Sequence, residues 1–147
     1  MKSICIYCKN DGRYHDVPKG ATLEEVYETL ELNLPCCVTS CKVNNRVEGL
    51  HYTINDSRDL EYLTLASPSG LRTYTRSLFF VLYKAVRDLY PEAELRIGTL
   101  VAGGYFCRLA VPGGITPEVP ERLRRRMAEI VASDLPFRRV TAHTTDA

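Results

Sequence analysis

Cysteine is the residue type in this sequence with the most evident capacity for chemistry. Cys5 and Cys8 have the spacing of paired zinc ligands, and the later cysteines could complete a tetrahedral site. Both fall in an apparent strand, where an odd separation points two side chains to opposite faces. No second C-x-x-C follows. The pattern favours buried or half-buried free thiols over zinc, and we expect no metal at Cys5, Cys8, Cys36, Cys37, Cys41 and Cys107.

Other catalytic groupings are missing from the sequence. His15, His51 and His143 lie far apart and beside no nucleophile, which favours surface histidines. Cys107 lies in an apparent strand, which favours a core thiol over a nucleophile. No run matches the phosphate-binding loop G-x-x-x-x-G-K-[ST]. We therefore expect no catalytic residue and no cofactor site in this chain.

A group of arginines is the best local candidate for binding. Arg122, Arg125 and Arg126 occupy positions i, i+3 and i+4 of an expected helix and share one face. Arg138 and Arg139 follow that helix. Such a ridge can contact the phosphates of RNA. The alternative is a solvated helix face whose charges are partly paired with nearby glutamates.

Composition limits the classes of partner. The chain has 147 residues, of which 45% are hydrophobic and 25% charged, and its net charge is +1. Whole-molecule charge therefore does not argue for nucleic acid, and such a surface must be local. No apolar run approaches the length of a signal peptide core or of a membrane-spanning helix. We expect a cytoplasmic protein with no membrane partner; the oligomeric state stays open.

The first 65 residues are predicted to pack strands against one helix. Asp11-Gly12 is typical of a tight hairpin turn. Thr22 and Glu25 form a capping box at the start of a helix that extends to Leu30. Two strands, a helix and then further strands is the order of a β-grasp domain. The strands are expected at residues 2–8, 13–17, 38–43, 46–50 and 60–65.

Residues 67–70 have the composition of a linker, so we predict two domains, at residues 1–66 and 70–147. The second begins with a long helix that is apolar almost all round, with Leu78 in its core stripe. A later helix is expected to be capped by Thr116, with Val131 in its buried stripe. The predicted elements are a helix at 73–90, strands at 95–97 and 105–111, a helix from 116, and a strand over 137–141.

The chain resembles a known pair of domains. Residues 42–50, KVNNRVEGL, resemble the end of a TGS domain, the ubiquitin-like module that opens threonyl-tRNA synthetases. Residues 85–91, AVRDLYP, and 95–98, LRIG, resemble the start of their second, editing-type domain. The resemblance implies an α+β chain: a β-grasp (ubiquitin-like) TGS domain followed by the first part of an editing-type α+β domain.

The same two modules also open nucleoside kinases that resemble uridine kinase. Residues 68–74, PSGLRTY, and 77–80, SLFF, are more similar to that group. This resemblance implies a non-catalytic regulatory or binding region of a uridine kinase-like protein. ATP-binding and transferase activity would then belong to a downstream kinase domain, its partner in the same protein. The alternative is a fragment or stand-alone relative of the threonyl-tRNA synthetase N-terminal region that contacts or edits tRNA.

The TGS module itself leaves two roles open. In the families that it resembles, it is associated with RNA or with regulatory nucleotide ligands, so RNA or a nucleotide is an expected partner. The alternative is a docking module for the downstream domain of the same protein.

One departure from the editing-type pattern bears on chemistry. The editing helix carries H-x-x-x-H, and the matching positions here are Arg76 and Phe80. A phenylalanine cannot bind a metal or carry a proton, and an arginine stays protonated. The resemblance therefore implies a degenerate editing site. We expect the Phe80 ring to be buried and to fill the pocket, with Arg76 at its rim.

Overall fold

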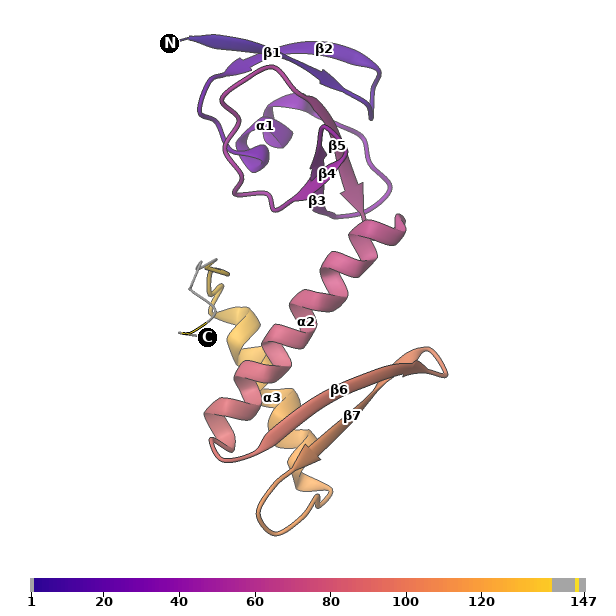
Figure 1. Ribbon diagram of the computed structural model, residues 1–147, viewed down its shortest axis with the longest axis vertical. Helices are drawn as coiled ribbons and strands as arrows, with labels where there is room; N and C mark the ends of the chain where they lie inside the picture. The colour runs from indigo at the N-terminus through magenta and orange to yellow at the C-terminus, as the bar shows by residue number, and fades with distance from the viewer. Residues whose placement is uncertain (1, 139–144, 146–147) are drawn as a thin grey trace. The chain divides into compact units, whose positions relative to one another are not determined.

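The computed structural model describes residues 2–138 and Thr145 (Figure 1). The chain divides into two compact units, Met1–Ser77 and Leu78–Ala147. Each unit has its own hydrophobic core.

The first unit contains a five-stranded mixed sheet. Its strand order is β2-β1-β5-β3-β4. The central β1 and β5 run parallel, and every other neighbouring pair is antiparallel. This is the β-grasp arrangement predicted from the order of elements. The strands are β1 (Ser3–Cys8), β2 (Arg13–Pro18), β3 (Val38–Val43), β4 (Arg46–Glu48) and β5 (Asp59–Thr64).

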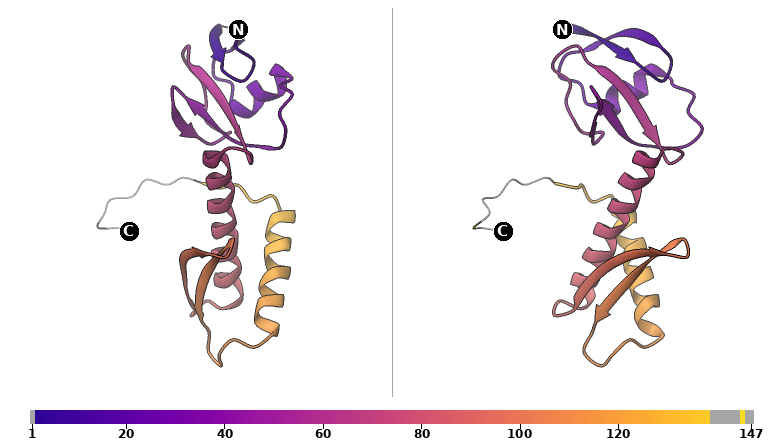
Figure 2. Two further views of the ribbon diagram at one scale, coloured as in Figure 1. Left: turned by 90° about the vertical axis from the view of Figure 1, so that its right-hand side faces the viewer. Right: turned by 45° about the vertical axis from the view of Figure 1, so that its right-hand side comes forward.

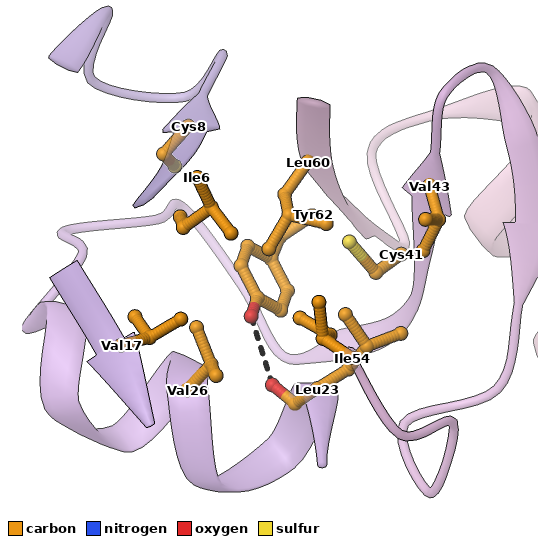
Figure 3. Packing of buried hydrophobic residues seen from close by; sticks show 10 residues of the cluster. All are labelled: Ile6, Cys8, Val17, Leu23, Val26, Cys41, Val43, Ile54, Leu60 and Tyr62. Atoms are coloured by element: carbon orange, nitrogen blue, oxygen red, sulfur yellow. Dashed lines mark hydrogen bonds between the residues drawn. The ribbon is translucent and has the colours of Figure 1, made fainter. Parts of the chain in front are cut away.

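Helix α1 (Leu23–Leu30) packs on this sheet and closes the first core (Figure 3). The predicted capping box is present: the Glu25 amide donates to the Thr22 hydroxyl, and the Thr22 amide donates to the Glu25 carboxylate. Leu23 and Val26 are the buried residues of the helix. The Tyr62 hydroxyl donates to the Leu23 carbonyl at 2.8 Å, so the one polar atom of a buried ring is satisfied.

Two tight turns fix the hairpins of the first unit. Gly12 has φ +71°, which glycine adopts at little cost, as the predicted Asp-Gly turn requires. Asn44 and Asn45 have φ 48° and 70°, so both adopt the left-handed conformation that asparagine tolerates. These positions set the β1–β2 and β3–β4 registers.

The predicted linker is instead the beginning of helix α2 (Pro68–Leu89). The Gly70 amide donates to the Ser67 hydroxyl at 3.1 Å, so Ser67 caps the helix. The helix thus starts five residues before the predicted Thr73. A serine followed by proline is as typical of a helix start as of a linker. The hydrogen bond of the Ser67 hydroxyl shows that here it is a helix start. The unit boundary lies further on, at Ser77, inside α2.

The second unit is built from the rest of α2, the hairpin β6 (Glu94–Val101) and β7 (Gly104–Ala110), and α3 (Glu118–Ala132). Figure 2 shows α3 running alongside the C-terminal part of α2. Leu95 and Leu109 pack the hairpin against the helices. The buried residues of this core are Ala85, Val86, Ala93, Val119, Leu123 and Ile130.

Three predictions for these helices are wrong. Leu78 and Val131 are exposed rather than part of the core stripes, because the small second core covers only one side of each helix. Helix α3 begins at Glu118 without a side-chain cap, so Thr116 does not cap it. The Thr116 side chain hydrogen-bonds to Glu118 instead, which lowers the pKa of that carboxyl. The strand predicted from residue 137 lies largely outside the described residues.

None of the helices in the described part of the chain combines the length and the apolar composition needed to cross a membrane.

Candidate functional site

Phe80 is exposed, so the prediction that its ring is buried in a filled pocket is wrong. The side chain is 64% exposed and lines an open groove of about 690 Å³ in the second unit. Its ring meets the Phe137 ring edge to face, with centroids 5.9 Å apart. Arg76 is also exposed and is not among the groove residues. The groove is lined by Phe80, Val81, Tyr83, Lys84, Ile130, Val131, Asp134, Leu135, Pro136, Phe137 and Arg138.

This groove offers little chemistry. Most of its lining is apolar, and its one carboxylate, Asp134, faces no histidine among the lining residues. Within residues 2–138 and Thr145, no group of three or more His, Cys, Asp or Glu side chains could hold a metal ion.

The cysteines are free, and the structure separates the zinc-spaced pair. Cys5 is exposed and Cys8 is buried in the first core, on the opposite face of β1, as predicted. Burial also raises the pKa of the Cys41 thiol to about 12, which leaves it unreactive. The expectation of buried thiols is wrong for Cys5, Cys37 and Cys107, which are exposed. Cys107 lies on a hairpin that the second core covers incompletely.

The histidines have ordinary surroundings. The His15 ring lies 2.8 Å from the Asp11 carboxylate in the β1–β2 hairpin, and it is half-buried rather than fully on the surface. His51 is exposed, 3.6 Å from Glu24. His143 lies outside the described residues.

The predicted arginine cluster separates into paired and unpaired members. Arg126 donates to Asp88 of α2 and to Glu129 at 2.8–3.0 Å. Arg124 forms a two-point ion pair with Glu121. Arg126 is therefore a structural link between α2 and α3 and not a free phosphate contact.

No ion pair among the described residues involves Arg122, Arg125 or Arg138. Arg122 lies over the Tyr90 ring, 5.5 Å from its centroid. Arg124 is the main cause of the lowered pKa of Glu121. Arg125 is exposed and lies near enough to add to that lowering. Arg138 lines the apolar groove. Arg139 lies outside the described residues.

The outer face of the β6–β7 hairpin carries a feature that the sequence did not indicate. Arg96 and Arg108 are direct cross-strand partners, so their side chains share one face. Like charges in this position repel each other. Glu94 pairs with Arg96 at 2.7 Å, while Arg108 forms no ion pair within the described residues. This face therefore presents the Arg108 guanidinium group, which an anion would stabilise.

An exposed aromatic ring lies beside these arginines. Phe106 is two residues from Arg108, on the same face of β7, and it is 57% exposed. A Cβ added at Gly98 would lie 3.6 Å from Phe106 Cδ1, so the ring lies across a glycine of the neighbouring strand. A free ring next to guanidinium groups on a sheet face suits an unpaired base and its phosphate.

Sequence reasoning could not find this face because it depends on strand register. The register shifts between Ile97 and Leu100, and a shift of one residue would move Arg96 away from Arg108. The available signal was one arginine on each side of Gly103, Arg96 and Arg108, with Tyr105 and Phe106 between Gly103 and Arg108.

Comparison with known proteins agrees with the resemblance to threonyl-tRNA synthetases. The chain is 32% identical over 137 residues to the threonine–tRNA ligase of Desulforamulus reducens, which covers 93% of the chain and 22% of that relative. It is 32% identical over 129 residues to the ligase of Rubrobacter xylanophilus, or 88% of the chain and 20% of the relative. The ligase of Pelobacter propionicus matches all 147 residues at 26% identity.

The chain spans about a fifth of the length of the curated relatives that it matches. No protein-family model matches the chain. The relatives support a domain pair like the N-terminal, TGS and editing-type region of threonyl-tRNA synthetases, in agreement with the α+β fold. They lend no support to a uridine kinase-like parent. The chain is thus similar over nearly its whole length to one region of threonine–tRNA ligases.

Proposed function

We propose that this chain is a non-catalytic RNA-contacting region related to the N-terminal region of threonyl-tRNA synthetases. This is the alternative that the sequence left open, and the similarity to threonine–tRNA ligases favours it. A uridine kinase-like parent with a downstream kinase domain remains a prediction that rests on residues 68–74 and 77–80 alone, and the relatives do not support it.

The observation that carries the proposal is the outer face of the β6–β7 hairpin. It combines the exposed Phe106 ring with Arg108, whose charge has no carboxylate partner in the described chain. An aromatic platform stacks on any unpaired base, and a guanidinium group contacts the adjoining phosphate. The expected ligand is the unpaired nucleotides of an RNA.

The absence of hydrolysis follows from the editing-type positions. Arg76 and Phe80 stand where the resemblance places two histidines, and neither can act as a metal ligand or a neutral base. The chain should therefore bind RNA without cleaving an aminoacyl ester. Its role would be to hold or orient RNA for a catalytic domain.

The test is binding of a single-stranded oligoribonucleotide, measured by fluorescence anisotropy. Phe106→Ala should weaken binding by about 5- to 150-fold, because stacking of one base on an aromatic ring contributes about 1–3 kcal/mol. Tyr83→Ala is the matched control, since Tyr83 is 51% exposed in the same unit but lies on α2 and not on the hairpin. It should leave the affinity unchanged.

Two results would count against the proposal. One is equal affinity of wild type and the Phe106→Ala variant for the oligoribonucleotide. The other is deacylation of mischarged threonine tRNA by the unmodified chain at an enzymatic rate. The second result would restore the editing interpretation and remove the non-catalytic one.

A further inference from the structure

The open groove of the second unit is lined by large apolar side chains that the chain leaves exposed. Five of them come from α2, from the end of α3 and from the segment after α3, and each is at least 48% exposed: Phe80, Tyr83, Val131, Leu135 and Phe137. All five line the same hollow of about 690 Å³. Apolar side chains gathered in this way mark an interaction surface.

The described part of the chain provides no cover for this surface. Phe80 and Phe137 meet edge to face, yet both rings stay more than half exposed. The residues after Arg138 read RVTAHTTDA, in which Val140 is the one large aliphatic side chain. A segment this polar gains little by lying on apolar groups. The groove therefore requires an apolar partner surface.

The charged groups of the groove indicate which surface that is. Asp134 and Arg138 line the groove and have opposite charges, and neither forms an ion pair among the described residues. Lys84, the other charged lining residue, already pairs with Asp88. A surface with one unpaired carboxylate and one unpaired guanidinium group beside apolar side chains is complementary to itself. In a twofold contact, Asp134 of one protomer can face the partner's Arg138, and symmetry forms the same pair again.

The apolar groups are self-complementary as well. A twofold contact uses the same patch on both protomers, so one surface must supply both the inserted groups and the hollow that receives them. Here the exposed rings of Phe80 and Tyr83 lie beside the hollow that they line. An apolar centre that contains aromatic side chains, with charged groups around it, is the usual composition of a protein interface.

We propose that this groove is a homodimer interface, occupied by the same groove of a second copy of the chain. The inference does not depend on the proposed function, because Phe106 and Arg108 of the hairpin are not among the groove residues. Five side chains that are already half-buried supply less than the roughly 800 Å² per partner of a stable interface. The dimer is therefore weak and depends on concentration.

Sedimentation equilibrium of the 147-residue chain tests the proposal between about 5 µM and about 500 µM, the range in which a weak interface associates. The average mass should rise from that of one chain toward that of two. Val131→Glu should weaken association by more than about 10-fold, because the contact would bury a carboxylate without a partner. Ile115→Glu is the matched control: Ile115 is an equally exposed β-branched residue of the same unit outside the groove, and association should be retained.

A charge reversal tests the ionic part of the contact. Arg138→Glu should place carboxylates opposite each other and weaken association. Added salt should then strengthen association of this variant and weaken that of wild type, because salt screens repulsion and attraction alike. Circular dichroism confirms that each variant is folded.

Three outcomes would overturn the inference. The mass of a single chain for wild type at the highest concentration would leave the groove to a partner of different chemistry. Equal association of folded Val131→Glu and Ile115→Glu would place the dimer contact outside the groove. Loss of association in Phe106→Ala would move the contact to the hairpin, whereas retained association in that variant separates the dimer from the proposed RNA face.

Discussion

At the scale of single residues, the contribution of Phe80 to stability depends on whether its ring is buried. A phenylalanine that replaces a histidine in a closed pocket would be part of the core, and its removal would leave a cavity. Here the ring lines an open groove and contacts Phe137, which is itself exposed. The ring therefore leaves the groove open at the position where the resemblance implies a histidine.

Phe80→Ala should therefore change the free energy of unfolding of the second unit by less than about 1 kcal/mol, as is usual for exposed positions. Leu123→Ala is the comparison within the same unit. Leu123 is 8% exposed, and its truncation should cost about 2–5 kcal/mol. Urea unfolding of both variants gives the two values. A larger loss for Phe80→Ala than for Leu123→Ala would mean that the ring is buried in solution.

At the scale of elements, the start of α2 packs closely on β3 and on the end of β5. The Thr39 hydroxyl donates to the Gly70 carbonyl at 3.1 Å, and the Ser40 and Thr73 hydroxyls are 3.4 Å apart. A Cβ added at Gly70 would lie 2.1 Å from the Thr64 carbonyl oxygen. Glycine is therefore needed here for close approach of two backbones.

Gly70→Ala should destabilise the first unit by about 1–3 kcal/mol, the usual cost of overpacking. Gly49→Ala is the matched control, because a Cβ at Gly49 has no atom within 4 Å and its φ is not in the left-handed region. Thermal unfolding followed by circular dichroism measures both. Equal melting temperatures for wild type and Gly70→Ala would show that α2 shifts freely at this contact.

At the scale of the whole molecule, acid should weaken the link between α2 and α3 of the second unit by protonating Asp88. Asp88 accepts hydrogen bonds from Arg126 of α3 and from Lys84. These bonds, that from Arg126 first, hold the pKa of Asp88 below its usual value. A carboxyl with a lowered folded pKa stabilises the protein above its unfolded pKa, which is about 3.9, and this contribution disappears as pH falls through the folded value.

Asp88→Asn should therefore be less stable than wild type at neutral pH, and the difference should shrink as pH falls below about 4. Asp134→Asn is the control, since Asp134 forms no ion pair within the described residues and asparagine tolerates its φ of 45°. It should not alter the pH dependence. Urea unfolding of wild type and both variants across the pH range measures these differences. A difference in the free energy of unfolding between wild type and Asp88→Asn that stays constant down to pH 2 would contradict the prediction.

The sequence by itself determined most of the first unit. The Asp-Gly turn, the Thr22–Glu25 capping box and the alternation of β1 are local patterns, and local patterns depend on neighbouring residues only. The opposite faces of Cys5 and Cys8 followed from the period of a strand. The degenerate editing-type positions, Arg76 and Phe80, were also readable without coordinates.

The tertiary structure decided what depends on distant contacts. It placed Phe80 on the surface, joined Arg126 to Asp88 across 38 residues, and left Arg122 and Arg125 without an ion pair among the described residues. It also brought Arg108 opposite Arg96 through a hairpin register with an irregularity. Burial and charge pairing are properties of neighbours in space, and a helical or strand period indicates a face without indicating what covers it.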